Sequence, residues 1–429
     1  MSSKIKPVIR QAWPRPEVLF SDAPPAGASE AGAGGVSPAE HYTGYVFPVS
    51  GQGTISFTFK ADRPFRIVVN SQPKPSYGSR EVVVLEVTDR RAAFLRANTD
   101  LPRDVLDETT EAKALLNPGA EQLAYWLSLD TNNRVLKYGK GEMLNRLVLF
   151  TYRFPPKPEP PLADPFAYLA GLKCIALSGV ETASVADHAL SSLPVTLDPP
   201  PQIIATDQIT LEDIAENLFS VAADLPQACQ ALYANVAGPS VTLRPKDFPE
   251  FPEAINYSIN TPGGLCYRKL DEKPKQFGYL RITMDPNLGD SPGSPYVLEI
   301  WPAQHGSPIH DHGDACAVIK VLEGTIRVKW FPGLSPDIEV PFGQVDLTEG
   351  DVTFLTPRAY QIHQLFNPDD RKRMTATIQC YRYPADDTVH YEYFDYVEDG
   401  VIKQFTPDSD WEYLEFKALI RKEWDARPR

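Results

Sequence analysis

The chain has 429 residues, of which 42% are hydrophobic and 23% charged, and its formal net charge at pH 7 is −14. This length exceeds one ordinary core and predicts two domains. The acidic balance argues against a general nucleic-acid binder, because phosphate contacts need clustered Lys and Arg, and it opposes docking on an anionic membrane. We therefore expect neither nucleic-acid nor membrane partners.

The cysteines indicate the compartment. There are five, an odd number, and they are widely spaced: Cys174, Cys229, Cys266, Cys316 and Cys380. Such a set is not a disulfide framework and favours a reducing environment. The first residues carry charge without an apolar run behind it, and no stretch of about 18 apolar residues follows. We expect a cytoplasmic protein without a signal peptide.

The N-terminal part predicts β-structure. Residues 1–39 are expected to be a flexible segment, because 21–37 are small and rich in Pro and Gly. Short runs bounded by Gly, Pro or Ser then indicate strands and a sandwich-like β-rich domain over 40–155. Within it we expect a helix at DVLDETTEAKALL and a solvated hairpin end at KYGKGEM. Its role stays open among partner binding, gating and dimerisation.

Two proline clusters, PPKPEPP at 155–161 and DPPP at 198–201, favour a connecting region over 156–207. The apolar stretch between them is expected to pack onto one of the domains, and the sequence does not decide which.

From residue 208 to 429 we expect a second domain that begins with helices. Thr210 is placed to cap a helix over LEDIAENLFSVAADL, and PQACQALYANVA predicts another. Strand-like runs then follow at the density of a small antiparallel barrel. The C-terminal tail predicts a packing helix with Trp411, Leu414 and Ala418 on one face.

Histidines mark the candidate site. His310 and His312 are two residues apart, a spacing that in a strand points both imidazoles to the same face, where they can share one metal ion. His363, in the strand-like run QIHQLFN, is the natural third ligand. Three neutral imidazoles leave three octahedral positions open, which suits Fe(II) that must hold substrate and dioxygen together. His305, five residues earlier, is expected to be structural or to lie beside the site.

Two runs around these histidines carry a family resemblance. HGSPIHDHGDACAVIKVLEG resembles the first cupin motif, and GDVTFLTPRAYQIHQLFN resembles the second. Most cupins add a glutamate ligand shortly after the histidine pair, where this chain has Cys316 and Ala317. The resulting three-histidine set is similar to that of thiol dioxygenases, and of cysteine dioxygenase above all. The resemblance covers about 208–396 and implies a mainly β fold with a double-stranded β-helix, or jelly-roll barrel, behind a helical lead-in.

The resemblance also implies roles for further residues. Tyr279 and Arg281 match the family's Tyr-x-Arg element, in which the guanidinium holds the substrate carboxylate. Tyr381 matches a tyrosine that faces the substrate thiol and oxygen. Ala317 stands at the position of the cysteine that crosslinks to this tyrosine in animal-type members, with Cys316 one place early. The residues expected around this centre, without direct contact to the metal, are Cys316, Gln379, Thr377, Asn367 and His305, of which Gln379 and Thr377 replace the family's histidine and serine.

The sequence thus predicts an enzyme that binds one Fe(II) per chain and uses O2 to oxidise a small carboxylate-bearing thiol, L-cysteine first, to its sulfinic acid. Two alternatives stay open. One is a cupin metalloenzyme for another sulfur compound, such as 3-mercaptopropionate or a larger thiol, and the other is a non-catalytic metal- or ligand-binding cupin. The oligomeric state is not predicted.

Overall fold

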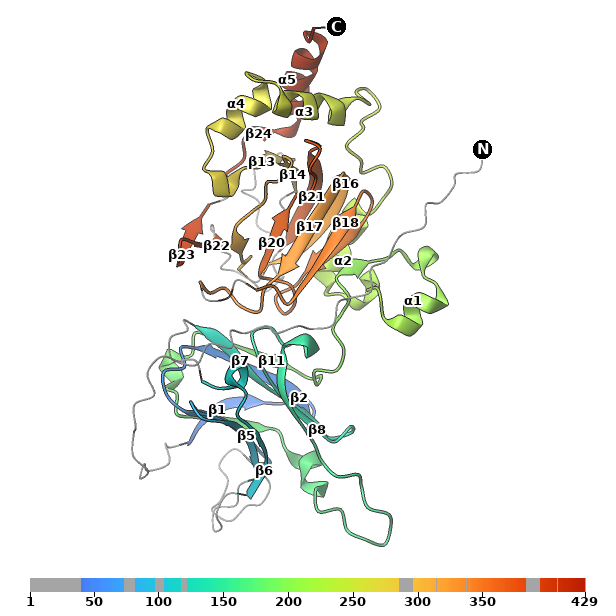
Figure 1. Ribbon diagram of the computed structural model, residues 1–429. Coiled ribbons are helices and arrows are strands. Elements are labelled where there is room, and N and C mark those ends of the chain that lie inside the picture. The colour runs from blue at the N-terminus through green and yellow to red at the C-terminus, as the bar shows by residue number, and fades with distance from the viewer. Residues whose placement is uncertain are drawn as a thin grey trace. The chain divides into compact units, whose positions relative to one another are not determined.

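The computed structural model describes residues 40–72, 82–96, 104–116, 122–284, 296–313, 315–336, 338, 340–382, 394–406 and 408–428. Two compact units divide between Asp198 and Pro199 (Figure 1). The predicted flexible segment 1–39 lies outside the described residues. No helix in the described ranges has the length and apolar character needed to cross a membrane.

The N-terminal unit consists of two antiparallel sheets. The first has the order β1-β10-β3-β4-β5-β6 and the second β11-β2-β7-β8-β9. Their bounds are β1 Glu40–Val46, β2 Gln52–Phe59, β3 Phe65–Asn70, β4 Val82–Val87, β5 Ala92–Arg96, β6 Asp104–Thr109, β7 Leu123–Asp130, β8 Val135–Lys140, β9 Val148–Arg153, β10 Cys174–Ser178 and β11 Asp187–Ser191.

Aromatic side chains join the two sheets. The Phe65 ring on β3 lies with its centroid 5.0 Å from Phe59 on β2 and 4.9 Å from Tyr125 on β7. Phe94 on β5 stacks on Phe150 of β9 at 4.7 Å. Large buried rings of this kind dominate the energy of a core, so the sheets face each other and the predicted β-sandwich is confirmed.

Three local expectations for this half were wrong. The segment 156–207 is more than a connection, because β10 inserts between β1 and β3 and β11 pairs with β2. The expectation that its apolar stretch packs onto one of the domains is confirmed, and that domain is the N-terminal one. Residues 104–109 form the edge strand β6 in place of the expected helix, since they pair with β5, and only the 3-10 turn Ala112–Ala114 follows. Lys140, in the expected solvated hairpin end, is buried.

The C-terminal unit begins with short helices. Thr210 caps α1, Leu211–Glu216, in a reciprocal capping box with Asp213, as its sequence predicted. The helix ends at Asn217, which adopts the left-handed conformation, so the expected continuation through residue 225 was wrong. The second predicted helix is confirmed as α2, Gln227–Val236. Its C-terminal carbonyls accept hydrogen bonds from the buried Lys320 ammonium, including 2.8 Å to Gly238 O.

The rest of this unit is a barrel of two antiparallel sheets, apart from one parallel pairing at an edge. Their orders are β12-β19-β16-β21-β14-β13-β24 and β18-β17-β20-β15-β22-β23, with β13 and β24 as the parallel pair. Their bounds are β12 Gln202–Ile203, β13 Leu280–Thr283, β14 Tyr296–Trp301, β15 Ile309–His310, β16 Cys316–Glu323, β17 Thr325–Trp330, β18 Gly343–Thr348, β19 Val352–Leu355, β20 His363–Phe366, β21 Thr375–Arg382, β22 Phe394–Glu398, β23 Val401–Phe405 and β24 Trp411–Glu412. This arrangement is the predicted double-stranded β-helix.

Three helices gather beside one end of the barrel: α3 Phe251–Asn260, α4 Leu265–Asp271 and α5 Tyr413–Asp425 (Figure 1). The C-terminal helix was predicted, but its predicted packing face of Trp411, Leu414 and Ala418 was wrong, because Trp411 precedes the helix in β24 and both Leu414 and Ala418 are exposed. Phe416 and Ile420 are buried, and the Phe416 ring lies 5.8 Å from Phe251. Leu414 is 67% exposed, because the spacing of four residues between Phe416 and Ile420 defines the face that meets α3.

Candidate metal centre

Three short elements of the second sheet bring the predicted ligands together. His310 on β15 is the register partner of His363 on β20, and β20 in turn pairs with β17. His312 follows β15 in the turn that leads to β16. All three imidazoles are buried. We expected His310 and His312 to point to the same face of one strand. Strand β15 ends at His310, yet the two imidazoles still lie together.

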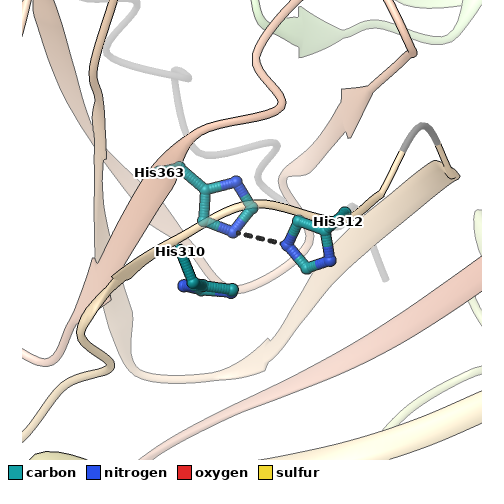
Figure 2. A group of neighbouring side chains, drawn as sticks. All are labelled: His310, His312 and His363. Atoms are coloured by element: carbon teal, nitrogen blue, oxygen red, sulfur yellow. Dashed lines mark hydrogen bonds between the residues drawn. The ribbon is translucent and has the colours of Figure 1, made fainter. Parts of the chain in front are cut away.

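The three imidazoles converge on one point, as Figure 2 shows. Their ligand nitrogens all lie within 4.8 Å of one another, and the Nε2 atoms of His312 and His363 are 3.3 Å apart. Two nitrogens that each sit about 2.1 Å from one ion, at an angle of about 90–110°, are separated by roughly 3.0–3.4 Å. The spacing of the His312 and His363 nitrogens therefore fits neighbouring positions around a single metal ion.

Backbone carbonyls orient two of the rings. His310 Nδ1 lies 3.0 Å from Pro308 O, and His363 Nδ1 lies 3.3 Å from Tyr360 O. An Nδ1 proton donated to a carbonyl leaves the Nε2 lone pair free for a metal. The Nδ1 atom of His312 is buried and has no hydrogen-bond partner among the described residues.

Burial keeps these imidazoles neutral. Loss of solvation lowers the pKa of His310 to about 4 and that of His363 to about 3, and it holds the pKa of His312 well below its usual value. Metal ligation requires the neutral ring. The donor set is thus ready to bind a divalent ion at pH 7, and these three residues fit a metal.

A small cavity adjoins the histidines. Its volume is about 10 Å³, room for about one ordered water. Its lining combines His310 and His312 with polar and aromatic side chains: Tyr279, Arg281, Glu299, Trp301, Ser307, Leu365, Gln379, Tyr381, Phe394 and Phe405. The sequence-predicted substrate residues Tyr279, Arg281 and Tyr381 are all in this set, so the structure brings them to the metal centre.

A chain of hydrogen bonds runs through this cavity wall. Arg281 Nη1 donates to Glu299 Oε1 at 2.8 Å. Gln379 Nε2 donates to Glu299 Oε2, and the Tyr381 hydroxyl donates to Gln379 Oε1. Both carboxylate oxygens therefore accept a hydrogen bond, as an ionised Glu299 requires.

Burial raises the pKa of both acidic groups in this hydrogen-bonded chain, Glu299 and Tyr381. It raises the pKa of the Glu299 carboxyl, an effect that the Arg281 guanidinium opposes. It also raises the pKa of the Tyr381 phenol well above its usual value, and Glu299 adds to the rise. Tyr381 stays protonated at neutral pH and can act as a hydrogen-bond donor, with its ring stacked 5.3 Å from that of His312.

The residues expected around the centre have different places. Thr377 accepts a hydrogen bond from Trp301 Nε1 at 3.2 Å and thereby holds a cavity wall. Asn367 orders the turn after β20, because its Nδ2 donates to Trp301 O and Arg373 O, both at 2.9 Å. His305 is not among the residues that line the cavity.

Cys316 does not line the cavity either. The neighbouring Cys229 thiol of α2, which donates to Leu355 O at 3.4 Å, lowers the pKa of the Cys316 thiol, and both cysteines are free and buried. Ala317 is the register partner of Tyr381. The strand thus places Ala317, which has no thiol, opposite the tyrosine.

Sequence reasoning missed Glu299 and the two phenylalanines of the β22–β23 hairpin. The signal for Glu299 is present in the sequence, since it is the one charge in the otherwise apolar run YVLEIW. A carboxylate is almost never fully buried without a partner, so such a position predicts a buried cation nearby. No comparable signal marks Phe394 and Phe405, whose place depends on how the hairpin folds over the site.

The comparison with models of known families gives no match, and no curated protein matches the sequence. Among solved structures, an uncharacterised double-stranded β-helix protein from Klebsiella pneumoniae is 15% identical, with 30% of this chain and 95% of that one covered and a TM-score of 0.21. A cupin-superfamily sugar phosphate isomerase from Silicibacter pomeroyi is 11% identical over 32% and 83%, with a TM-score of 0.21. An oxalate oxidase in complex with the substrate analogue glycolate is 14% identical over 26% and 53%, also at 0.21.

At TM-scores of 0.21 these similarities carry no argument about this chain. The class follows from the sheets and the site: residues 199–429 contain a double-stranded β-helix with three histidines that could hold a metal ion.

Proposed function

We propose that residues 199–429 form an Fe(II)-dependent thiol dioxygenase, with one iron per chain, that converts a small thiol and O2 into a sulfinic acid. One observation carries the proposal. Among the described residues, three buried, neutral imidazoles lie together with no carboxylate in the group, beside a small cavity lined by Arg281 and Tyr381. A centre with neutral ligands alone leaves both charges of the ion uncompensated, and this favours an anionic thiolate as the next ligand.

The overall reaction is balanced without an external reductant. When bound, Fe(II) would supply the positions at which a thiolate and dioxygen meet. Sulfur loses four electrons, dioxygen gains four, the O–O bond breaks and two S–O bonds form, so that R–SH and O2 give R–SO2H. The thiol proton leaves as the thiolate forms, and the sulfinic acid loses its proton at neutral pH.

The chain's own residues would bind the substrate and exclude water. Leu365, Phe394 and Phe405 form the apolar part of the cavity wall, and a dry wall strengthens each polar contact inside. The Tyr381 phenol stays protonated, and it would donate its one proton toward a bound thiolate or oxygen atom by leaving its present acceptor, Gln379 Oε1. Arg281 supplies a buried positive charge for a substrate head group.

The resemblance to cysteine dioxygenase favours L-cysteine as the substrate. The alternatives are 3-mercaptopropionate, a larger thiol, or metal binding without catalysis. A substrate of any of these sizes needs more than about 10 Å³, so side chains of the wall must move on binding. We extend the proposal to a reducing, cytoplasmic compartment, because the neighbouring Cys229 and Cys316 are free thiols.

Oxygen consumption by the Fe(II)-loaded protein tests this function, with L-cysteine, cysteamine and 3-mercaptopropionate offered separately. We expect uptake of one O2 for each sulfinate formed, and none in His363→Ala. Retained iron binding with no uptake for any thiol, including larger ones, would contradict the proposed activity and favour a non-catalytic metal site.

A further inference from the structure

The cavity wall contains two opposite charges. Arg281 and Glu299 are register partners on β13 and β14, and they are only 8% and 3% exposed. Their side chains meet at 2.8 Å. The pair therefore gives the wall of the cavity no net charge but a strong local dipole. An arginine alone would attract carboxylates in general, whereas this pair does not.

Each member of the pair keeps unused hydrogen-bonding capacity. Arg281 Nε is buried and has no hydrogen-bond partner among the described residues. Each oxygen of Glu299 accepts one hydrogen bond, while a carboxylate oxygen can accept two. A buried donor without a partner is costly, and a ligand acceptor would satisfy it. The pair is thus built to receive one more acceptor at Arg281 and one more donor at Glu299.

We propose that Glu299 and Arg281 together recognise a zwitterionic amino-thiol, in which Glu299 holds the ammonium group and Arg281 the carboxylate. The inference rests on the proposed thiol dioxygenase function and deepens it. It makes Glu299, which the family resemblance does not include, a specificity-determining residue.

Charge balance gives the reason. A zwitterionic head group adds no net charge to a wall whose own charges already cancel, so every buried charge keeps an opposite neighbour. The carboxylate of 3-mercaptopropionate would lie beside Glu299 without a cation of its own, and the ammonium of cysteamine would lie beside Arg281 without an anion. Burial makes either mismatch expensive.

The same contact reaches Tyr381. Gln379 bridges Glu299 and the Tyr381 hydroxyl through two hydrogen bonds. An ammonium group at Glu299 would therefore bind at one end of the chain whose other end is the phenol beside His312. The Gln379 amide therefore links the binding of the head group at Glu299 to the position of the Tyr381 phenol.

The first test uses the unaltered protein and two readouts. Binding is measured by calorimetry of the Fe(II)-loaded protein under argon, and turnover by oxygen uptake, with L-cysteine, 3-mercaptopropionate and cysteamine. We expect L-cysteine to be preferred over each of the other two by about 100-fold in both readouts, because a polar site rejects ligands that leave its groups unpaired. Equal preference for L-cysteine and 3-mercaptopropionate would overturn the inference.

The second test is Glu299→Gln, which retains the shape and can still accept hydrogen bonds but removes the negative charge. We expect the preference for L-cysteine over 3-mercaptopropionate to fall by at least about tenfold, because Arg281 then attracts any carboxylate. Glu323→Gln is the matched control, since Glu323 pairs with Arg244 outside the cavity, and we expect the wild-type preference.

The outcomes separate the two proposals. Thiol binding and oxygen uptake with an unchanged preference in Glu299→Gln would overturn the role of Glu299 and leave the dioxygenase function standing. Absence of both binding and uptake for every thiol would overturn the function and this inference with it. If Glu299→Gln does not fold, the preference of the wild-type protein among the three thiols decides.

Discussion

Arg281 donates a 2.8 Å hydrogen bond to Glu299 from the neighbouring strand, so the guanidinium expected to hold a substrate carboxylate already has an internal one. A substrate carboxylate at Arg281 would therefore share the guanidinium with Glu299. The pair also has consequences for stability that do not depend on any substrate.

Removal of one member of the pair should cost more than removal of both. We expect Arg281→Leu or Glu299→Leu alone to lower the free energy of unfolding by about 3–5 kcal/mol, because each leaves a buried charge without a partner. The double variant should recover most of this loss, since two apolar side chains then face each other. Urea unfolding of all four proteins gives the coupling energy, and additive losses would contradict the pairing.

The metal should depend on the three clustered histidines and not on their neighbour. We expect His363→Ala to lower Fe(II) affinity by at least about 100-fold, since loss of an orienting contact alone costs 10–100-fold. His305→Ala is the control, because His305 does not line the cavity, and it should bind one iron per chain after dialysis. Metal analysis of both variants decides, and equal iron contents would refute the predicted ligand set.

The metal-free protein should lose stability as the pH falls from about 6.5. The pKa values of His310 and His363 are lowered to about 4 and about 3, while an unfolded histidine has a pKa of about 6.5. Between these values the unfolded chain binds more protons, so unfolding becomes easier, by about 1.4 kcal/mol per pH unit for each histidine. Unfolding in urea at pH 7, 6 and 5 measures the slope, and His363→Gln should reduce it; an equal slope in the variant would count against buried neutral histidines.

Local patterns were sufficient for much of this fold. The capping box at Thr210 and Asp213 and the strands around His310 and His363 are encoded by residues close in sequence. The spacing of His310 and His312 also pointed to a shared site, because two side chains so close in sequence need little long-range information to lie together.

The sequence did not predict which strands far apart along the chain pair with one another. The insertion of β10 between β1 and β3 joins residues more than 100 positions apart, and nothing in CIALS identifies those partners. The same holds for Glu299. Its burial could be inferred from the apolar strand around it, but its pairing with Arg281 depends on the register of β13 against β14.

Lys140 gives a last prediction, in the N-terminal sandwich. Its ammonium is buried, donates to Leu115 O at 2.5 Å and lies 5.7 Å above the Tyr125 ring. Burial lowers its pKa to about 7, against about 10.4 in an unfolded chain. Between these values the unfolded state binds more protons, so we expect the stability of the sandwich to rise from pH 7 to 10.

Substitution of Lys140 isolates this effect. Lys140→Met removes the charge, so the rise with pH should disappear and the free energy of unfolding at pH 7 should increase by about 2 kcal/mol, after allowance for the lost hydrogen bond. Lys60 is exposed, so Lys60→Met is the control variant. Its stability should still increase from pH 7 to 10. Denaturation followed by the fluorescence of buried Trp126 reports on this unit. If the stability of Lys140→Met still rises from pH 7 to 10, a group other than the Lys140 amine must be losing its proton on folding.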